Sequence, residues 1–305
     1  MNNANCSMKQ LKRRIKRTYN FISSHPLTRR HVFRSIGRVL YWQLQTTLKP
    51  NSEIEKTFIK PVKFYARKRR AGVTGNIYSG LHEFNEMAFL LHFLREKDVF
   101  FDLGANVGVY TLLASGICKA KSVALEPIPS TFKLLSRNIE LNNLQYKVTL
   151  INAAAGDEPG TLIFSSAQDT TNHVIRPNET ATNTIEVDVI KIDSLVHYNP
   201  ALIKIDVEGF ESRVLIGAEN ILKSIALKAI IIELSNTVEY GFNDTYTHHL
   251  LTLNGFKPFS YDPFIRKLSS ISELLSDNII YCRDLNFARS RVKNAEPIKI
   301  MGERI

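Results

Sequence analysis

Two carboxylates, Asp206 and Glu208, follow an apolar stretch at residues 202–205 and precede Gly209. A second apolar stretch further along the chain ends in a third carboxylate, Glu233. If the two stretches are neighbouring parallel strands, their carboxyl ends meet at one edge of a sheet and the three acids line one rim. Crowded carboxylates raise one another's pKa, so one of them could serve as a general base near neutral pH.

A ligand-binding turn is expected within VFFDLGANVGVYT, residues 99–111. This segment lies at a predicted strand-to-helix junction, where glycines let a ligand approach the backbone closely. The next predicted strand ends at Glu126, an acid that could accept hydrogen bonds from both hydroxyls of a ribose. Ala153 follows the third predicted strand, where the edge of a base would lie. The turn itself contributes the candidate binding residues Asp102, Gly104, Asn106 and Gly108.

This turn departs from the dinucleotide fingerprint GxGxxG, which seats a pyrophosphate on a helix N-terminus. Asn106 stands in place of the second glycine, and Asp102 comes just before the first. An acid beside the turn disfavours a pyrophosphate and suits a cationic ligand. S-adenosylmethionine carries a sulfonium and an ammonium group, so it is the predicted cofactor, with Asp102 organising its methionine end. NAD and a tight turn without a ligand are the alternatives.

Alternating strand and helix patterns must position these residues. Helical segments separate most of the apolar runs, which is typical of βαβ units and of a mostly parallel sheet covered on both faces. Short alternating runs within residues 160–192 predict an additional β-hairpin. The seven predicted strands lie in DVFFDLGAN, SVALEP, KVTLINAAAG, ALIKIDVEG, LKAIIIELS, FKPFSYD and NIIYCRD.

The sequence resembles the FkbM family of S-adenosylmethionine-dependent methyltransferases over about residues 80–285. This resemblance implies a class I methyltransferase fold, with a mostly parallel seven-stranded sheet, and O-methylation, commonly of sugar hydroxyls in glycans or glycosylated metabolites. The matching segments, in family order, are VFFDLGANVGVYTLLAS, VALEP, INAAAGDEPG, LIKIDVEGFESRVLIGAE, IIIEL and NIIYCRD.

Methyl transfer to a hydroxyl requires in-line positioning of the acceptor oxygen and removal of its proton. Asp206, Glu208 and Glu233 are therefore the candidate catalytic residues, and Lys204 could pair with one of them. The three acids could instead hold a divalent cation or bond turn amides, but no metal is predicted. Methyltransferases that act on the amino groups of nucleic acid bases typically carry Pro-Pro-aromatic after the acid at this place. Here Val-Glu-Gly follows Asp206, and this difference favours a hydroxyl acceptor. Candidate acceptor-binding residues are His82, Glu83, Tyr110, Asn172 and His173.

Positive charge is concentrated at the N-terminus. Residues 1–70 hold 18 Lys and Arg against two acids, a net charge of +16, whereas residues 71–305 carry −5. Such asymmetry indicates an anionic partner: a membrane surface, a nucleic acid or a phosphorylated substrate. The spacing predicts a helix over residues 28–48 that packs on the body and leaves its arginines in water, with attachment to an anionic membrane as the alternative. Its apolar positions are Val32, Ile36, Val39, Leu40 and Leu44, and its flank carries Arg29, Arg30, Arg34 and Arg38.

The predicted organisation is a basic, largely helical extension over residues 1–75, a methyltransferase domain over 76–290 and a tail over 291–305. Three cysteines without a CxxC pair fit reduced thiols, and zinc is not indicated. No apolar run approaches the ~20 residues that span a bilayer. These features predict a cytoplasmic protein, with attachment to the inner face of the membrane as an alternative. An RNA-associated protein and an NAD-dependent oxidoreductase are the competing functions, although no nucleic-acid partner is expected.

Overall fold

A computed structural model describes residues 2–50, 52–67, 71–166, 172–176, 179–180, 183–234, 240–272 and 278–305 of the chain. The structure describes only the backbone for residues 2–11, 14 and 71. The loop predicted at AQDTTNHVI therefore falls partly outside the described residues.

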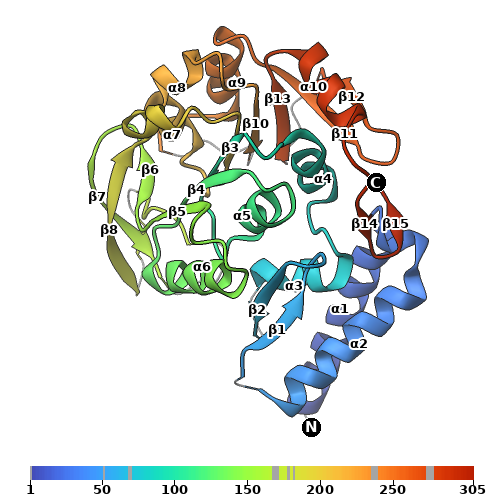
Figure 1. Ribbon diagram of the computed structural model, residues 1–305. Coiled ribbons are helices and arrows are strands. Elements are labelled where there is room, and N and C mark those ends of the chain that lie inside the picture. Colours follow the sequence, from blue (N-terminus) through green and yellow to red (C-terminus); the bar gives the residue numbers. More distant parts are fainter. Residues whose placement is uncertain are drawn as a thin grey trace.

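The chain is organised around an eight-stranded sheet with the strand order β12-β11-β13-β10-β9-β3-β4-β5 (Figure 1). Five neighbouring strands, from β10 to β5, run parallel, and β13 runs antiparallel between β10 and β11. This arrangement confirms the predicted class I methyltransferase fold. The bounds are β3 Val99–Leu103, β4 Lys121–Leu125, β5 Val148–Ile151, β9 Leu202–Ile205, β10 Ala229–Glu233, β11 Lys257–Asp262, β12 Lys267–Ser270 and β13 Asn278–Cys282.

All seven predicted strands are present, but the sheet carries one strand more than predicted. The additional strand, β12, forms a hairpin with β11 at the edge of the sheet. It has four residues, of which Leu268 alone is buried. An edge strand this short buries too little apolar surface to produce a recognisable alternation in the sequence.

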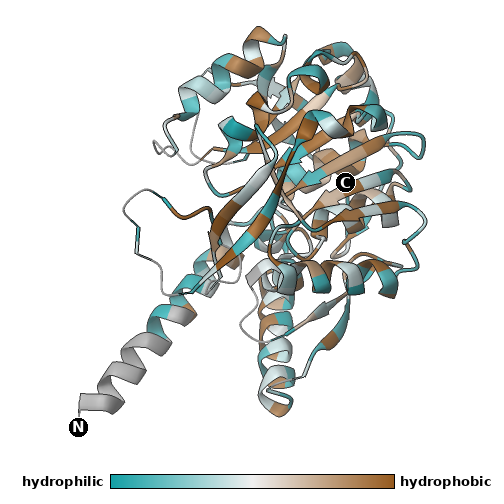
Figure 2. Cartoon of the chain, turned by 90° about the vertical axis from the view of Figure 1, so that its left-hand side faces the viewer, coloured by the Kyte–Doolittle hydropathy of each residue, from teal (hydrophilic) through white to brown (hydrophobic). Residues whose placement is uncertain are grey.

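Both faces of the sheet are covered by helices, because both sets of alternating strand side chains are apolar. Phe100 and Leu202 point to one face, whereas their neighbours Phe101 and Ile203 point to the other. Figure 2 shows hydrophobic residues concentrated along these strands. The first face packs against α4 Phe84–Phe93, α5 Val109–Thr111, the π-helical turn Leu112–Ile117, α6 Pro129–Leu141 and α10 Leu285–Lys293, and the second against the 3-10 helix Ile192–Tyr198, α7 Glu211–Ile216, α8 Glu219–Lys223 and α9 Asp244–Leu253.

The hairpin predicted within residues 160–192 is present as β7 Gly160–Ser165 and β8 Thr184–Lys191. A third strand, β6 Ala154–Gly156, pairs with β8 and makes a separate small sheet. Because β6 follows directly on β5, this small sheet stands beside the carboxyl end of the large one. Its apolar side chains Phe164, Val187 and Val189 pack with Ile128 and Phe210.

The N-terminal extension is helical, with a small hairpin that the sequence did not predict. The elements are α1 Asn2–Ser24, a 3-10 turn Thr28–Arg30, α2 Val32–Leu48, β1 Ile54–Thr57, β2 Lys63–Ala66 and α3 Ala71–Ser79. Trp42 and Phe64 join the same apolar cluster as Phe89 of α4, so the extension shares the core of the body. The predicted boundary at residue 75 falls inside α3. Within the described residues, no helix has the length and apolar content required to cross a membrane.

The expectation that the arginines of residues 28–48 stay in water is wrong for Arg38, which is half-buried, whereas Arg29, Arg30 and Arg34 are exposed. Arg34 and Arg38 donate to the backbone carbonyls of Met301 and Ile77, at 3.1 and 2.8 Å. Arg30 pairs with Glu303 at 3.4 Å, and His31 contacts the same carboxylate at 2.7 Å. The partners at residues 301 and 303 lie in and beside the C-terminal hairpin β14 Lys299–Ile300 and β15 Glu303–Arg304, which packs on the extension.

Candidate active site

The turn after β3 is held against the loop after β9 by a contact that admits no side chain. Gly104 has a φ of +79°, and a Cβ there would lie 1.8 Å from the carbonyl oxygen of Asp206. Its amide and that of Ala105 both donate to the Leu125 carbonyl, at 3.1 and 2.8 Å. The sequence predicted a glycine that lets a ligand approach, but its nearest neighbour is the Asp206 backbone. Gly104 therefore fixes the spacing between the two strand ends that carry the candidate residues.

Gly104→Ala is expected to lower the free energy of unfolding by at least about 2 kcal/mol, because it combines a left-handed backbone with a backbone clash. Chemical denaturation of the variant measures this loss. Gly160→Ala is the matched control, since a Cβ at Gly160 meets nothing within 4 Å. Equal stability of the two variants would show that the turn can open without cost.

Asp102 stabilises the first turn of α5. Its Oδ2 accepts hydrogen bonds from the Thr111 amide at 3.0 Å and from the Thr111 hydroxyl at 2.5 Å. The carboxyl is 1% exposed, and burial raises its pKa although the Lys204 ammonium lowers it. Asp102 thus orients the helix that follows the turn and also lines the second of the two cavities described below.

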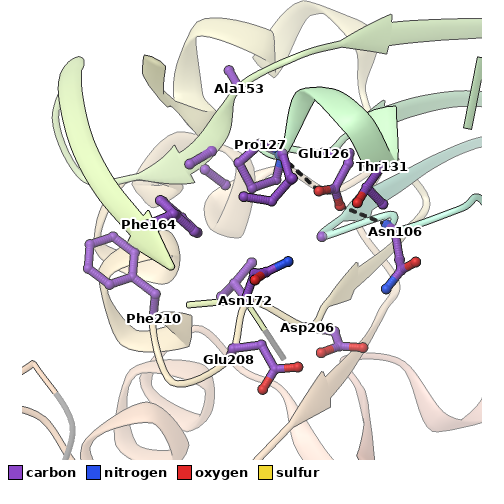
Figure 3. A pocket seen from close by; sticks show the side chains of 15 residues that line it. Asn106, Glu126, Pro127, Thr131, Ala153, Phe164, Asn172, Asp206, Glu208 and Phe210 are labelled. Carbon is purple, nitrogen blue, oxygen red and sulfur yellow. Dashed lines mark hydrogen bonds between the residues drawn. The ribbon is translucent and has the colours of Figure 1, made fainter. Parts of the chain in front are cut away.

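Glu126 is buried at the end of β4 and accepts two backbone hydrogen bonds. The amides of Asn106 and Ile128 donate to its two carboxyl oxygens at 3.0 and 2.9 Å (Figure 3). Burial raises its pKa to about 7, although both hydrogen bonds lower it. The side chain of Asn152 donates to the carbonyls of Glu126 and Pro127, at 2.8 and 3.0 Å, and so fixes the chain where it leaves β4.

A cavity with an empty volume of about 670 Å³ opens beside Glu126. Its wall is acidic at Glu126 and apolar at Ala153, Phe164 and Phe210 (Figure 3). A ribose with an attached base has the same division between hydroxyls and an apolar ring. The predicted residues that line this cavity are Gly104, Asn106, Glu126, Ala153, Asn172, Asp206 and Glu208.

The sequence analysis missed the aromatic wall of this cavity. Phe164 comes from β7, and Phe210 immediately precedes α7. Both belong to the cluster that joins the small sheet to the body. Phe210 was visible in the segment KIDVEGFE, but the position of Phe164 depends on how the small sheet folds over the large one.

A second cavity, with an empty volume of about 820 Å³, adjoins the first and shares Gly104, Asn106, Asp206 and Glu208 with it. Carboxyl groups dominate its described lining. Asp206, Glu208 and Glu233 all line it, as expected for acids at the carboxyl ends of the neighbouring strands β9 and β10. These three acids are joined by Glu83 and Asp102, with Lys204 as the cation and with His82 and Tyr110 beside them.

Asp206 is held in its ionised form by Lys204. The Nζ of Lys204 lies 2.5 Å from Oδ2 of Asp206, and the lysine side chain is 4% exposed. Burial raises the pKa of Asp206, but the Lys204 ammonium and a hydrogen bond with Glu233 outweigh it, so the pKa lies below its usual value. Burial lowers the pKa of Lys204, but the carboxylates of Asp206, Glu83 and Asp102 raise it further, so Lys204 stays protonated.

Glu233 holds a proton in this cluster. Burial raises its pKa to about 9, helped by the hydrogen bond with Asp206 and by the charges of Asp206 and Glu208. At neutral pH the Glu233 carboxyl therefore donates a hydrogen bond to Asp206. Within the described part of the chain, no group of three His, Cys, Asp or Glu side chains is arranged to hold a metal ion.

Glu208 does not continue the strand, contrary to the extended geometry assumed from the sequence. β9 ends at Ile205, and Glu208 adopts a φ of 54° in a turn with Gly209. A residue that the sequence analysis missed, Glu211, holds this turn. Its Oε1 accepts from the amides of Val207 and Gly209 at 3.1 and 3.2 Å. The turn-stabilising role considered for the acids at this strand end thus belongs to Glu211, and Asp206 and Glu208 face the cavities.

Most of the candidate acceptor residues line one of the two cavities, but His173 does not. Tyr110 donates a hydrogen bond to Glu83, and both line the second cavity, while Asn172 lines the first. His173 lies elsewhere: its Nε2 contacts Glu179 at 3.0 Å, and it is not among the described residues that line either cavity. The structure therefore does not bring His173 to Asp206.

Comparisons with known proteins agree with this geometry. A family model described as the methyltransferase FkbM domain matches residues 102–260, which span the turn after β3, the first cavity, part of the second cavity and β10. The "Hexuronic acid methyltransferase AglP" of Haloferax volcanii is 30% identical over 155 residues, which are 49% of this chain and 61% of that protein. "Methyltransferase 1" of Beauveria bassiana is 29% identical over 144 residues, 39% of this chain and 57% of that protein. The match thus spans about three-fifths of each of these relatives.

Among solved structures, a methyltransferase FkbM from Methylobacillus flagellatus KT shares 18% sequence identity with this chain. Its alignment covers 62% of this chain and 44% of that one, with a TM-score of 0.42.

Proposed function

Because the chain belongs to the FkbM methyltransferase family, we propose that it transfers the methyl group of S-adenosylmethionine to a hydroxyl group of a sugar. The observation that carries this proposal is the meeting of two cavities at Asp206. One has the lining expected for a nucleoside, and the other is rich in hydrogen-bond acceptors. A cofactor in the first and an acceptor in the second would meet beside an ionised carboxylate.

The residues of the first cavity fit the adenosine part of the cofactor. Glu126 would accept hydrogen bonds from the ribose hydroxyls, and Ala153, Phe164 and Phe210 would surround the base. Asp102 would face the ammonium group at the methionine end. When bound, S-adenosylmethionine supplies a methyl group made electrophilic by its sulfonium. The protein's part is to bind the acceptor, exclude water and take up the hydroxyl proton.

Asp206 is the proposed base. The proton of a hydroxyl becomes acidic as its oxygen forms a bond to carbon, so a carboxylate of low pKa is sufficient. Lys204 keeps Asp206 ionised and fixes its orientation. The protonated Glu233 donates a hydrogen bond to the same carboxylate, and Asp206 lines both cavities, where it would meet the acceptor.

The charge of the second cavity supports an acceptor without a carboxylate. Its described lining holds five carboxyl groups against one lysine. Glu233 is protonated, Asp206 is paired with Lys204 and Asp102 would face the cofactor, but Glu83 and Glu208 remain as further acids. Like charges in a shared site repel, whereas sugar hydroxyls donate readily to carboxylates. We therefore propose a neutral sugar or an amino sugar, in contrast to the hexuronic acid in the name of the Haloferax relative.

Glu233→Gln is expected to change kcat at neutral pH by less than about fivefold, because glutamine resembles the protonated carboxyl. Its effect on stability depends on pH. The folded state holds the Glu233 proton up to a pKa of about 9, whereas the unfolded state releases it near the ordinary value of 4.5. The free energy of unfolding of the wild type should therefore fall as pH rises between these values. The variant should lack this contribution to the pH dependence.

Urea denaturation across this pH range measures the slope. Glu158→Gln, which removes a carboxylate on an exposed side chain paired with Lys191, should retain the wild-type slope. If Glu233→Gln also retained it, Glu233 would be ionised in the folded protein and the assignment of its proton would be wrong.

The proposal as a whole is tested by ligand binding. S-adenosylhomocysteine at 100 times its Kd should stabilise the protein by roughly 2.7 kcal/mol and raise its Tm, whereas NAD should leave the Tm unchanged. Transfer of a labelled methyl group should then be faster to neutral sugars and amino sugars than to uronic acids. Stabilisation by NAD alone would contradict the cofactor, and a preference for uronic acids would contradict the acceptor.

A further inference from the structure

Helix α2 turns an apolar stripe away from the protein. At 3.6 residues per turn, positions 33, 37, 40, 44 and 48 follow one face, with 41 and 47 at its sides. This outer stripe contains no charged residue, since Gly37 and Thr47 are its two other members. Its large side chains are all exposed: Phe33 by 91%, Leu40 by 64%, Tyr41 by 60%, Leu44 by 57% and Leu48 by 72%.

The inner side of α2 is more polar than its outer side. Trp42 is buried there, together with Ser35 and Thr46. Arg34 and Arg38 point toward the body and donate to backbone carbonyls. A helix that serves only to pack on a globular body has the opposite arrangement, with its apolar stripe inward. A contiguous apolar surface of this kind marks an interaction site.

The neighbouring helix α1 adds positive charge to this end of the molecule. Its exposed residues include Ile15 and Tyr19 as well as the cations Lys12, Arg13, Lys16 and Arg17. Figures 1 and 2 show α1 and α2 at the same end of the molecule. The two acids of residues 1–70 pair with cations outside α1 and α2: Glu53 pairs with Arg137 and Glu55 with Lys63.

We propose that α1 and α2 form a docking surface for an anionic lipid bilayer. Apolar side chains of an interfacial helix enter the boundary between headgroups and acyl chains, and nearby lysines and arginines contact anionic headgroups. The net charge of +16 on residues 1–70 selects this occupant over a second copy of the chain. Pairing two outer stripes would bring two such segments together at a cost in electrostatic repulsion.

Vesicle sedimentation with the full chain tests this proposal. The protein should sediment with vesicles of phosphatidylcholine and phosphatidylglycerol, bind phosphatidylcholine alone at least about tenfold more weakly, and dissociate as salt is added. Leu40→Asp with Leu44→Asp should weaken binding to the anionic vesicles by at least about tenfold. Lys12→Gln with Lys16→Gln should do the same, since each cation contributes roughly fivefold.

The matched control is Ile225→Asp with Leu253→Asp. These side chains are 85% and 69% exposed, and they adjoin α8 and α9, at the far end of the molecule from α2 (Figure 1). The control should bind vesicles as the wild type does. Because all four apolar positions are exposed, both variants should fold, and thermal melting checks this.

Three results would overturn the proposal. The first is an absence of wild-type binding to anionic vesicles, and the second is equal binding by the stripe variant and the control. The third is a dimer in size-exclusion chromatography that Leu40→Asp with Leu44→Asp dissociates while vesicle binding stays unchanged, because the stripe would then be the contact between two copies.

Discussion

Asp206→Asn is expected to lower kcat by roughly 10²–10⁴-fold, the usual contribution of a general base. Asparagine keeps the shape of the side chain but cannot take up the hydroxyl proton. The amide also loses the charge that pairs with Lys204, whose Nζ lies 2.5 Å from the carboxylate. Glu83 and Asp102 remain close enough to stabilise the lysine, so the fold should persist. Steady-state kinetics and titration with S-adenosylhomocysteine measure the two effects separately, and Kd should change by less than about fivefold.

Asp157→Asn is the matched control for this variant. Asp157 pairs with Arg213 at 2.7 Å, and its side chain is 23% exposed, against 25% for Asp206. It is not among the described residues that line either cavity. A small loss of stability with unchanged kcat is expected. If Asp206→Asn retained most of the wild-type kcat, Asp206 would not be the base.

Glu126→Gln is expected to raise the Kd for S-adenosylhomocysteine by roughly 10–100-fold, or about 1.4–2.8 kcal/mol. Both carboxyl oxygens accept backbone hydrogen bonds, from Asn106 and Ile128. Glutamine offers one oxygen, and its amide nitrogen must face one of these donors, which leaves a buried group unsatisfied. The turn that follows β3 should loosen, and the bonds to the ribose should lose their ionic part. Calorimetric titration measures the Kd.

Asp193→Asn controls for the loss of a carboxylate that accepts two amides. Oδ1 of Asp193 accepts from the amides of Asn220 and Ile221, both at 3.0 Å, outside the described lining of either cavity. This control should lower stability without changing the Kd. Equal effects of the two substitutions on Kd would mean that Glu126 acts through the fold and does not contact the cofactor.

The sheet and the meeting of Asp206 with Glu233 were predictable because both depend on chain order. Strands of buried apolar residues, separated by helices, pair in parallel, and their carboxyl ends meet at one edge. The pairing of Lys204 with Asp206 was also within reach, since the two residues are close in sequence. The turn after β3 was recognisable because glycines and an acid have few reasons to occur together there.

Features that depend on packing between distant segments were not predictable in the same way. Position 104 requires glycine because the Asp206 carbonyl oxygen packs directly against it. These two residues are far apart in sequence, so the sequence alone does not reveal the contact. The aromatic contribution of Phe164 depends on the small sheet folding over the large one. The outer stripe of α2 had the helical period of a packing face, and the period alone does not tell which side faces the protein.

The most direct test of the proposed activity is the product of a reaction with methyl-labelled S-adenosylmethionine and a neutral sugar acceptor. Mass spectrometry with linkage analysis should find one added methyl group as an ether on a sugar hydroxyl, stable to mild base. One S-adenosylhomocysteine should form for each product, and Asp206→Asn should form neither at a comparable rate. A base-labile methyl ester, a methylated nitrogen or release of S-adenosylhomocysteine without a methylated sugar would contradict the account.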